Sequence, residues 1–325
     1  INHKSEKDDE AWKLIYISLI QKIRKPKTIK QFRPIAILPV LCKLYSKLLE
    51  WLLLGTGTNL RSTLAVQFAF KPGHQCHEVV FILRRIIELA IEWQTNVFIV
   101  DGDISKAYDY TKHDRVCEAL VDKGANKLLV AAILREVINK TCKLKLGKQE
   151  SNKALPRTRA IWQGDPSAPH LFNATLDLIA VRFTTIAKRN KWGWPYKVGD
   201  TMEHLCLLLF ADNYWLITTS PQELQAANDC WQSLLKEFGW HTDVGDLTYG
   251  STAEDKDFLQ SVKFQGKNVY RCPRKLGYKV LGTILIFNNR NDLELDRRIR
   301  AAWRAFFKYK SVLCSKAFTL SKRIT

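Results

Sequence analysis

The sequence lacks the signatures of several large protein classes. Its eight cysteines form no CxxC pair and several lie in apolar runs, which argues against a zinc ribbon and a secreted disulfide scaffold. No stretch approaches 18 uncharged apolar residues, so no transmembrane helix is expected, and no signal peptide is visible. A GxxxxGK(S/T) loop and a GxGxxG loop after a strand are also missing, which weakens NTPase and dinucleotide-binding interpretations. We therefore expect an intracellular protein with reduced core thiols, in either the nucleus or the cytoplasm.

Methionine and acidic residues are scarce. The chain begins with Ile1 and its one methionine is Met202, so we expect an excerpt of a longer protein with additional domains. Lysine and arginine number 51 against 32 acidic residues, which gives a formal charge of +19. Such an excess favours a polyanionic partner, nucleic acid first and a membrane surface second. With 325 residues, 46% of them hydrophobic, the chain can fold into two or three subdomains.

Hydrophobic periodicity predicts a mixture of helices and strands. Strand character is expected over 96–103, over 276–286 and in a hairpin over 205–219, and the basic segment 141–160 is expected to form a hairpin plus a loop. Residues 9–23 fit a helix or a strand, and the chain is expected to be irregular from 239 to about 276. This order favours an α+β fold. The expected helices are 35–54 (entered after Pro39), 77–92, 112–123, 126–139, about 167–189, 222–237 and 292–313.

The hairpin over 205–219, LCLLLFADNYWLITT, carries an acidic residue between two apolar strands. Asp212 and Asn213 are typical turn residues, so we place Asp212 at the tip. Burying an ionised, unpaired carboxylate there costs several kcal/mol, and such a group usually binds a cation. Asp103 likewise ends the apolar strand 96–103, and two neighbouring strand-end carboxylates suit Mg²⁺ shared with substrate phosphates. On pattern alone, caps or salt-bridge partners remain the commoner explanation for such a pair.

The surrounding motifs resemble the polymerase core of reverse transcriptases, most closely those of non-LTR (LINE-type) retrotransposons. The resemblance covers residues from about 10 to 325 and depends on the motifs jointly. The matching motifs are Phe32-Arg33-Pro34-Ile35 with Lys43-x-x-Ser46-Lys47, Gln67-x-x-Phe70-Lys71-x-Gly73, Asp103-Ile104-Ser105-Lys106-Ala107-Tyr108-Asp109, Gln163-Gly164-x-Pro166-x-x-Pro169, Phe210-Ala211-Asp212, Val280-Leu281-Gly282 and Arg297-Arg298-Ile299 with Ala302-Trp303.

The resemblance implies a right-hand polymerase fold and RNA-directed DNA synthesis. Fingers are expected over 1–92, a palm with an antiparallel sheet over 93–289 (with an inserted fingers segment at about 126–160), and a truncated thumb start over 290–325. The expected partners are an RNA template, a DNA primer and dNTPs, with no membrane. The expected cofactors are two Mg²⁺ ions, for which Mn²⁺ is a possible substitute.

The resemblance also implies roles for individual residues. Asp103, Asp212 and the Ile104 carbonyl would hold the two metal ions, with Asp212 followed by Asn213 in the catalytic motif. Tyr108 stands where the family places the aromatic ring that blocks a 2′-hydroxyl. The remaining expected binding residues are Arg33, Lys71, Gln163 and Gly164 for the nucleotide, and Arg157, Arg159, Arg297, Arg298, Arg300 and Arg304 for nucleic acid.

Two neighbouring carboxylates of the proposed site need separate explanations. Asp101 shares a strand face with Asp103, and we expect it to be turned aside or screened by a lysine. Asp109 is expected to cap or brace the following turn.

The sequence departs from the family at two positions. Asn213 replaces the usual second aspartate, which lowers the expected metal affinity. Asp246 lies near the place of a lysine suited to protonating pyrophosphate, where His241 is an alternative acid. These departures keep a second hypothesis open, namely a catalytically impaired remnant that binds nucleic acid only. An RNA-templated RNA polymerase or an intron maturase is a weaker alternative, and Tyr108 argues against the first of these.

Overall fold

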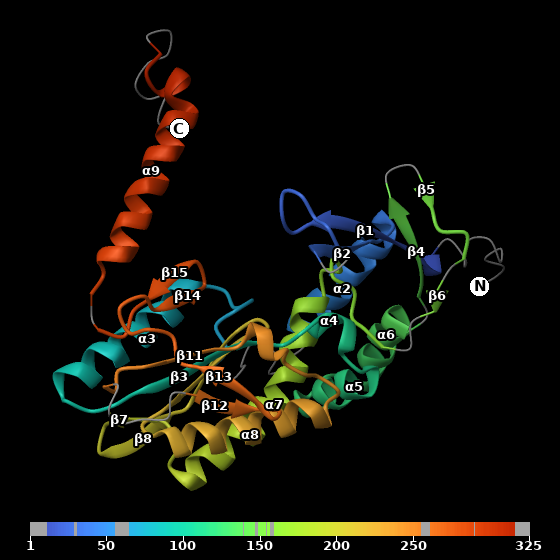
Figure 1. The fold of residues 1–325 in the computed structure, drawn as a ribbon. Helices are drawn as coiled ribbons and strands as arrows, with labels where there is room; N and C mark the ends of the chain where they lie inside the picture. Colours follow the sequence, from blue (N-terminus) through green and yellow to red (C-terminus); the bar gives the residue numbers. More distant parts are fainter. Residues whose placement is uncertain are drawn as a thin grey trace, which may run out of the picture.

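The computed structural model describes residues 12–28, 31–55, 65–138, 140–146, 149–153, 155–156, 159–254, 261–288 and 290–315. Two sheets organise these residues: one lies at the N-terminal end of the molecule and one forms its centre (Figure 1). None of the helices in these ranges is long and apolar enough to cross a membrane.

The N-terminal sheet has the strand order β2-β1-β4-β5, with β6 also paired to β4. Residues 9–23, for which helix and strand were both open, contribute the strand β1. The strand β2 was not predicted, because its Arg-Pro step and the basic residues before it are typical of a linker. The bounds are β1 Leu14–Gln21, β2 Phe32–Ile37, β4 Thr141–Leu146, β5 Gln149–Glu150 and β6 Leu155–Pro156.

The central sheet is antiparallel and has the order β11-β3-β10-β9. It unites the two strands that were expected to carry the catalytic carboxylates, because β10 pairs directly with β3. The predicted α+β fold is therefore observed. The bounds are β3 Phe98–Asp103, β9 Leu207–Phe210, β10 Asn213–Thr218 and β11 Thr248–Ser251.

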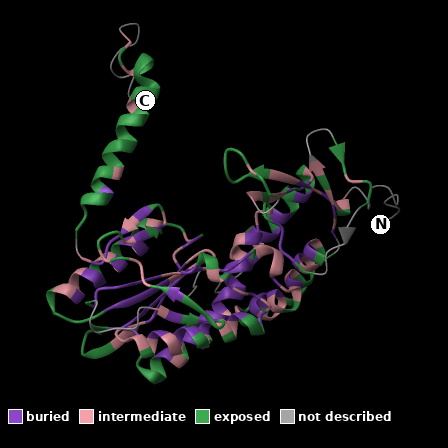
Figure 2. Ribbon diagram, viewed as in Figure 1, coloured by how far each residue is buried: buried purple, intermediate pink, exposed green. Residues whose placement is uncertain are grey.

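Side chains alternate between the two faces of the central sheet, as the two-residue period of a strand requires. Val100, Leu209 and Leu216 pack with α7 (Ala168–Asn190) and α8 (Pro221–Glu237). Ile99, Leu208 and Trp215 pack on the other side with α3 (Cys76–Glu92) and the hairpin of β14 (Tyr278–Val280) and β15 (Thr283–Leu285). The sheet is thus buried on both faces, as Figure 2 shows by its purple strands.

Most of the predicted helices are observed close to their expected bounds. The long helix α7 begins after Ser167 with a proline in its first turn, as predicted. The predicted strand character of 276–286 is present as the hairpin β14–β15. The remaining helices are α2 Val40–Gly55, α4 Ala107–Tyr110, α5 His113–Asp122, α6 Lys127–Ile138 and α9 Asp292–Leu313.

The expectation of an irregular chain from 239 to about 276 was wrong. This region holds β11, the 3₁₀ helix η3 (Val244–Asp246) and a hairpin of β12 (Ser261–Phe264) and β13 (Lys267–Tyr270). These strands have only four residues each and mix polar with apolar side chains, so their periodicity is weak. A second hairpin, β7 (Trp194–Val198) and β8 (Thr201–Leu205), was also not predicted.

Helix α9 projects from the rest of the molecule (Figure 1). Its surface is almost entirely exposed (Figure 2), and the one buried residue of the helix is Glu294 in its first turn. The oxygens of Glu294 accept hydrogen bonds from the Ile284 backbone and from the side chains of Arg297 and Arg298. The contact of α9 with the molecule is therefore made at its N-terminal end, against β15.

Candidate active site

A cavity of about 700 Å³ lies where the N-terminal sheet meets the central sheet. Its walls come from β1, β2, the end of β3, the loop before α7 and the turn between β9 and β10. Six of the predicted site residues line it together, although they are far apart in the sequence. These are Arg33, Asp103, Tyr108, Gln163, Gly164 and Asp212.

Asp103 and Asp212 are brought together by strand pairing. Asp103 ends β3 and lies opposite Asn213, the first residue of β10, so Asp212 precedes the paired position. The Ile104 N–H donates to the Asp212 carbonyl at 2.9 Å, which ties the two segments together. The expected Asp-Asn turn is shifted by one residue: the turn consists of Ala211 and Asp212, and Ala211 takes the left-handed conformation with φ of 56°. Positive φ at the first turn residue alone fits a type II′ hairpin.

A nearby cation would stabilise the charged form of both carboxylates. Burial and the nearby charge of Asp212 raise the pKa of Asp103. Burial also raises the pKa of Asp212, against the lowering effects of a hydrogen bond from its own backbone, of its hydrogen bond with Asp103 and of the Arg33 charge. Oxygen ligands of this kind suit a hard divalent cation. No group of three or more His, Cys, Asp or Glu side chains is placed to hold a metal in the ranges that the structure describes. The donor set therefore fits an ion that completes its coordination with water and substrate phosphates.

Asp101 lies on the same strand but has a different partner. Its carboxylate accepts a hydrogen bond from the Trp215 indole N–H at 2.8 Å, and burial raises its pKa to about 7. The lysine that was expected to screen Asp101 is replaced by this tryptophan, which is the cross-strand neighbour of Asp101 on β10. Asp101 is also not among the residues that line the cavity. The structure thus separates the two carboxylates that the sequence places on one strand face.

The Gln163–Gly164 loop is held against β2. The Ala36 N–H donates to the Gln163 carbonyl at 2.8 Å. Gly164 has φ of 122°, and a Cβ there would lie 2.5 Å from the Ala36 carbonyl oxygen, so only glycine fits. Because Arg33 also lies on β2, this contact brings the loop and Arg33 to the same wall of the cavity.

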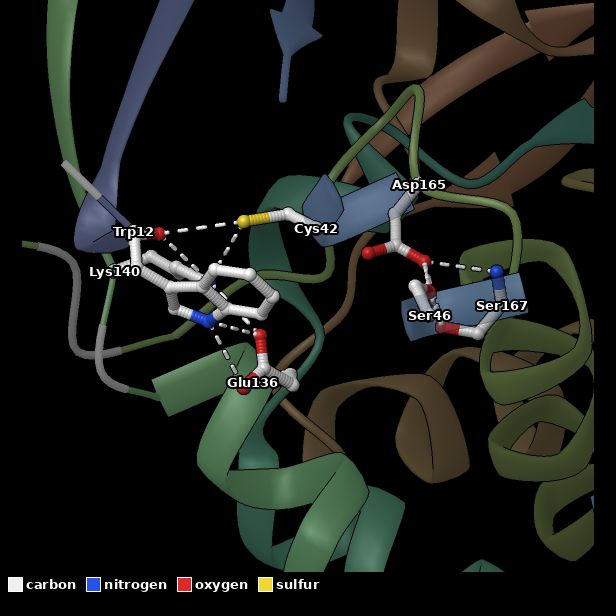
Figure 3. A network of polar contacts seen from close by, with 7 residues as sticks. All are labelled: Trp12, Cys42, Ser46, Glu136, Lys140, Asp165 and Ser167. Carbon is white, nitrogen blue, oxygen red and sulfur yellow. Dashed lines mark hydrogen bonds and ion pairs between the residues drawn. The ribbon is translucent and has the colours of Figure 1, made fainter. Parts of the chain in front are cut away.

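Helix α2 supports the loop from behind (Figure 3). The Asp165 carboxylate accepts hydrogen bonds from the Ser46 hydroxyl and from the Ser167 backbone N–H, the latter at 2.8 Å. One turn earlier on α2, the Cys42 thiol donates to the Trp12 carbonyl at 3.5 Å. Lys140 donates to that same carbonyl and to Glu136. Both ends of this network are buried or half-buried, so α2 links the N-terminal sheet to the cavity wall.

Tyr108 stands beside the carboxylates with its ring fixed. The ring stacks on Phe172 of α7 with centroids 5.2 Å apart and an interplanar angle of 18°. Its carbonyl accepts a hydrogen bond from the Ile161 N–H at 2.9 Å. Burial, with a smaller contribution from Asp212, raises the pKa of the phenol, so Tyr108 is neutral near pH 7. A rigid ring next to Asp103 can restrict which sugar enters the cavity.

Three of the residues predicted to take part in catalysis, metal binding or nucleotide binding do not line the cavity. Lys71 is half-buried; burial lowers its pKa, while Asp177 of α7 opposes that shift. Ile104 is fully buried behind the carboxylates. Asn213 lies opposite Asp103 on β10, and its amide nitrogen is 3.5 Å from an Asp212 carboxylate oxygen.

The arginines expected to bind nucleic acid lie in two separate places. Arg157 is outside the described residues, and Arg159 is exposed with its guanidinium 4.5 Å from the Tyr110 ring centroid. The other four lie on α9, where Arg297 and Arg298 form ion pairs with Glu294. The Arg300 guanidinium is 4.0 Å from the Asp296 carboxylate. The Arg300 backbone carbonyl accepts a hydrogen bond from the Arg304 side chain. Arg300 and Arg304 therefore present their charge to solvent.

The sequence interpretation missed two cationic residues that line the cavity, Lys22 after β1 and Lys106 after β3. Lys106 lies within a motif that was recognised, but nothing in its own pattern marks it as a site residue. The structure shows both lysines near the mouth because the strands that precede them end there. Gln67 was recognised as part of a motif, but its contact with the turn between β9 and β10 was not predicted.

Comparison with known proteins agrees with this geometry. The family described as reverse transcriptase (RNA-dependent DNA polymerase) matches residues 23–244. Retrovirus-related Pol polyproteins from R2 retrotransposable elements are similar in sequence. The protein from Popillia japonica is 28% identical over 119 residues, which is 37% of this chain and 16% of that protein. The protein from Nasonia vitripennis is 26% identical over 215 residues, 64% of this chain and 19% of that protein. The chain thus spans under a fifth of the length of these relatives.

Solved structures show the same fold at low sequence identity. Apo telomerase from Candida tropicalis, truncated from its C-terminal domain, matches with a TM-score of 0.54 and 12% identity, covering 83% of this chain and 55% of that one. Telomerase from Candida albicans, in complex with a fragment of telomeric RNA, matches with a TM-score of 0.53 and 11% identity, over 83% and 47% of the two chains. Reverse transcriptases generally use divalent metal ions, in agreement with the carboxylate pair. The expected right-hand polymerase fold and the expected resemblance to non-LTR retrotransposon enzymes are confirmed, and the chain belongs to the reverse transcriptase family.

Proposed function

We propose that this chain is the polymerase core of a retroelement protein that adds dNTPs to a primer 3′-hydroxyl on an RNA template. The observation that carries the proposal is that Asp103 and Asp212 line one cavity together with Arg33, Lys106 and Tyr108. The predicted division into fingers over 1–92, palm over 93–289 and thumb start from 290 belongs to the same proposal, as does an intracellular site of action.

Asp103 and Asp212 would hold two Mg²⁺ ions, which Mn²⁺ can replace. When bound, such ions activate the attacking hydroxyl and stabilise charge on the phosphate and leaving oxygens. The raised pKa values of both carboxyls support this assignment, because a bound cation relieves the repulsion between them. Asn213 offers one neutral oxygen beside them, and we assign it a secondary part in metal binding.

The chain's own cations would neutralise the triphosphate. Arg33 and Lys106 both line the cavity together with the two carboxylates, so they can meet phosphate oxygens of a bound nucleotide. We assign this role to Lys106 in place of Lys71, which lies outside the cavity lining. The main chain at Gly164 would lie along the nucleotide, because no side chain intervenes there.

Tyr108 would select deoxyribose. Its ring is stacked on Phe172, and this contact opposes a movement that would admit a 2′-hydroxyl. This rigidity supports DNA synthesis over RNA synthesis.

The second candidate is a remnant that binds nucleic acid without catalysis. Asn213 is the residue that keeps this alternative open, because it stands opposite Asp103 where the family usually has a second aspartate. Primer extension on an RNA template with Mg²⁺ separates the two functions. We expect extension by the chain and none by Asp103→Ala, with equal binding of primer–template by both. Equal background from the two proteins, with binding intact, would contradict the polymerase and support the remnant.

A further inference from the structure

Gln67 contacts the turn between β9 and β10, which consists of Ala211 and Asp212, from a distant part of the sequence. It lies between α2 and α3, its residue is only 1% exposed, and its backbone forms an isolated parallel bridge with Leu209 of β9. The neighbouring backbone groups complete this pairing, since the Phe68 N–H donates to the Leu209 carbonyl at 3.0 Å and the Leu209 N–H donates to the Val66 carbonyl at 2.8 Å. The segment around Gln67 is therefore fixed beside the strand that leads into Asp212.

The Gln67 carboxamide binds both backbone groups of Ala211. Its oxygen accepts a hydrogen bond from the Ala211 N–H at 3.1 Å, and its nitrogen donates to the Ala211 carbonyl at 3.4 Å. The same oxygen accepts the Ala69 N–H at 2.9 Å, which fixes the side chain within its own segment. The Gln67 carboxamide thus supplies the hydrogen bonds that a strand backbone would otherwise offer to Ala211.

Ala211 needs such support. Its φ of 56° is a conformation that glycine, asparagine and aspartate adopt readily, and alanine has neither the freedom of glycine nor a polar side chain to bond locally. The next residue, Asp212, is held from the other side by the Ile104 N–H. The two turn residues are therefore each fixed by a different segment, and both contacts together set the position of the Asp212 side chain.

We propose that Gln67 is a positioning residue that holds the β9–β10 turn and thereby sets Asp212 for metal binding. This inference rests on the proposed function only for the identity of the bound ion. Losing partners that orient a metal ligand typically lowers metal affinity by about 10- to 100-fold. A buried glutamine that merely stabilises the fold would lower stability and leave metal affinity unchanged.

The test uses the purified chain, with Gln67→Met to remove all three hydrogen bonds at similar length. Gln67→Asn is the second variant, because its carboxamide is one methylene too short to span to Ala211 and its smaller change favours folding. The matched control is Asn173→Leu. The Asn173 side chain donates to the Ala69 carbonyl at 2.9 Å, so it supports the same segment without contacting the turn.

Two readouts decide the proposal without primer extension. Hydrogen exchange without metal is expected to show faster exchange of the Ala211 amide, by at least about tenfold, in both Gln67 variants and not in Asn173→Leu. Electron paramagnetic resonance titration of Mn²⁺ with dTTP present is expected to show about 10-fold weaker binding in the Gln67 variants alone. Unchanged Ala211 exchange, or Mn²⁺ affinity that falls equally in Asn173→Leu, would overturn the inference. If the Gln67 variants differ from the wild type as expected but the wild-type chain shows no primer extension, the proposed function is overturned and the role of Gln67 stands.

Discussion

In the central sheet the charged side chains assigned to catalysis are fixed from several directions, whereas those of α9 stand in solvent. Asp212 is held by strand pairing, by the Ile104 amide and by a turn that Gln67 contacts. Arg300 and Arg304 are exposed and make polar contacts with residues of their own helix. A fixed carboxylate acts through its position, so a single substitution there can abolish catalysis. An exposed arginine acts through its charge, so its loss gives a small, salt-dependent change.

Apart from the loss of catalysis expected when Asp103 is replaced, the largest expected effect in this comparison is on sugar choice. Tyr108→Ala removes the ring that is stacked on Phe172 beside the carboxylates, so we expect discrimination against ribonucleotides to fall by about 10- to 100-fold. Tyr108→Phe keeps the ring and is the matched control, for which we expect unchanged discrimination. The measurement is kcat/KM for dNTPs and rNTPs in primer extension. Equal sugar choice in all three proteins would remove the gate assignment.

A smaller effect is expected from restoring the second aspartate. Asn213→Asp places a carboxylate opposite Asp103, so we expect the Mg²⁺ concentration for half-maximal activity to fall by about tenfold. Asn190→Asp, at the exposed end of α7, adds the same charge far from the cavity and should leave this concentration unchanged. If both variants behave as the wild type does, the Asn213 side chain has no part in metal binding.

The arginines of α9 should show the graded behaviour of exposed charges. We expect the double variant Arg300→Gln/Arg304→Gln to weaken primer–template binding about three- to tenfold at low salt and to reduce the salt slope by up to about 2. Arg189→Gln/Lys191→Gln removes two exposed cations at the end of α7 and serves as control. Fluorescence anisotropy at several salt concentrations measures both quantities. A salt slope that falls equally in the control would show that α9 has no specific contact.

The smallest effect concerns Glu294, the one buried residue of α9. Hydrogen bonding by Arg297 lowers its pKa to about 2 from an ordinary value of 4.5. A lowered pKa contributes stability that is fully present above about pH 4.5 and is lost as the pH falls through about 2. We therefore expect the melting temperature of the chain to exceed that of Glu294→Gln at pH 5, by a margin that shrinks toward pH 2. A difference in melting temperature that stays the same from pH 5 to pH 2 would show that the Glu294 charge does not stabilise the contact of α9.

The carboxylate pair and the helices could be predicted from the sequence because their signals are local. Asp103 and Asp212 each follow or interrupt an apolar strand within a recognisable motif, and α3 and α8 show clear helical periodicity. Pairing of β10 with β3 then brings the two aspartates together, as predicted.

The missed features depend on contacts between distant residues. The strand β11 has four residues of weak periodicity, and it is stabilised by pairing with β3. The partner of Asp101 is Trp215, which became its neighbour only through the register of β3 and β10. The contacts of Gln67 with Ala211 arise in the same way. Nothing in the sequence around any of these residues indicates its partner.

We assign the metal site to Asp103 and not to Asp101, two residues away on the same strand. The most direct measurement compares primer extension by Asp103→Asn and Asp101→Asn, each of which keeps shape and removes one charge. We predict that Asp103→Asn loses at least about a thousandfold in kcat. Asp101→Asn can still accept the Trp215 hydrogen bond and is predicted to stay within about threefold of wild type. Loss of activity in Asp101→Asn with retention of activity in Asp103→Asn would contradict the assignment of the metal site to Asp103.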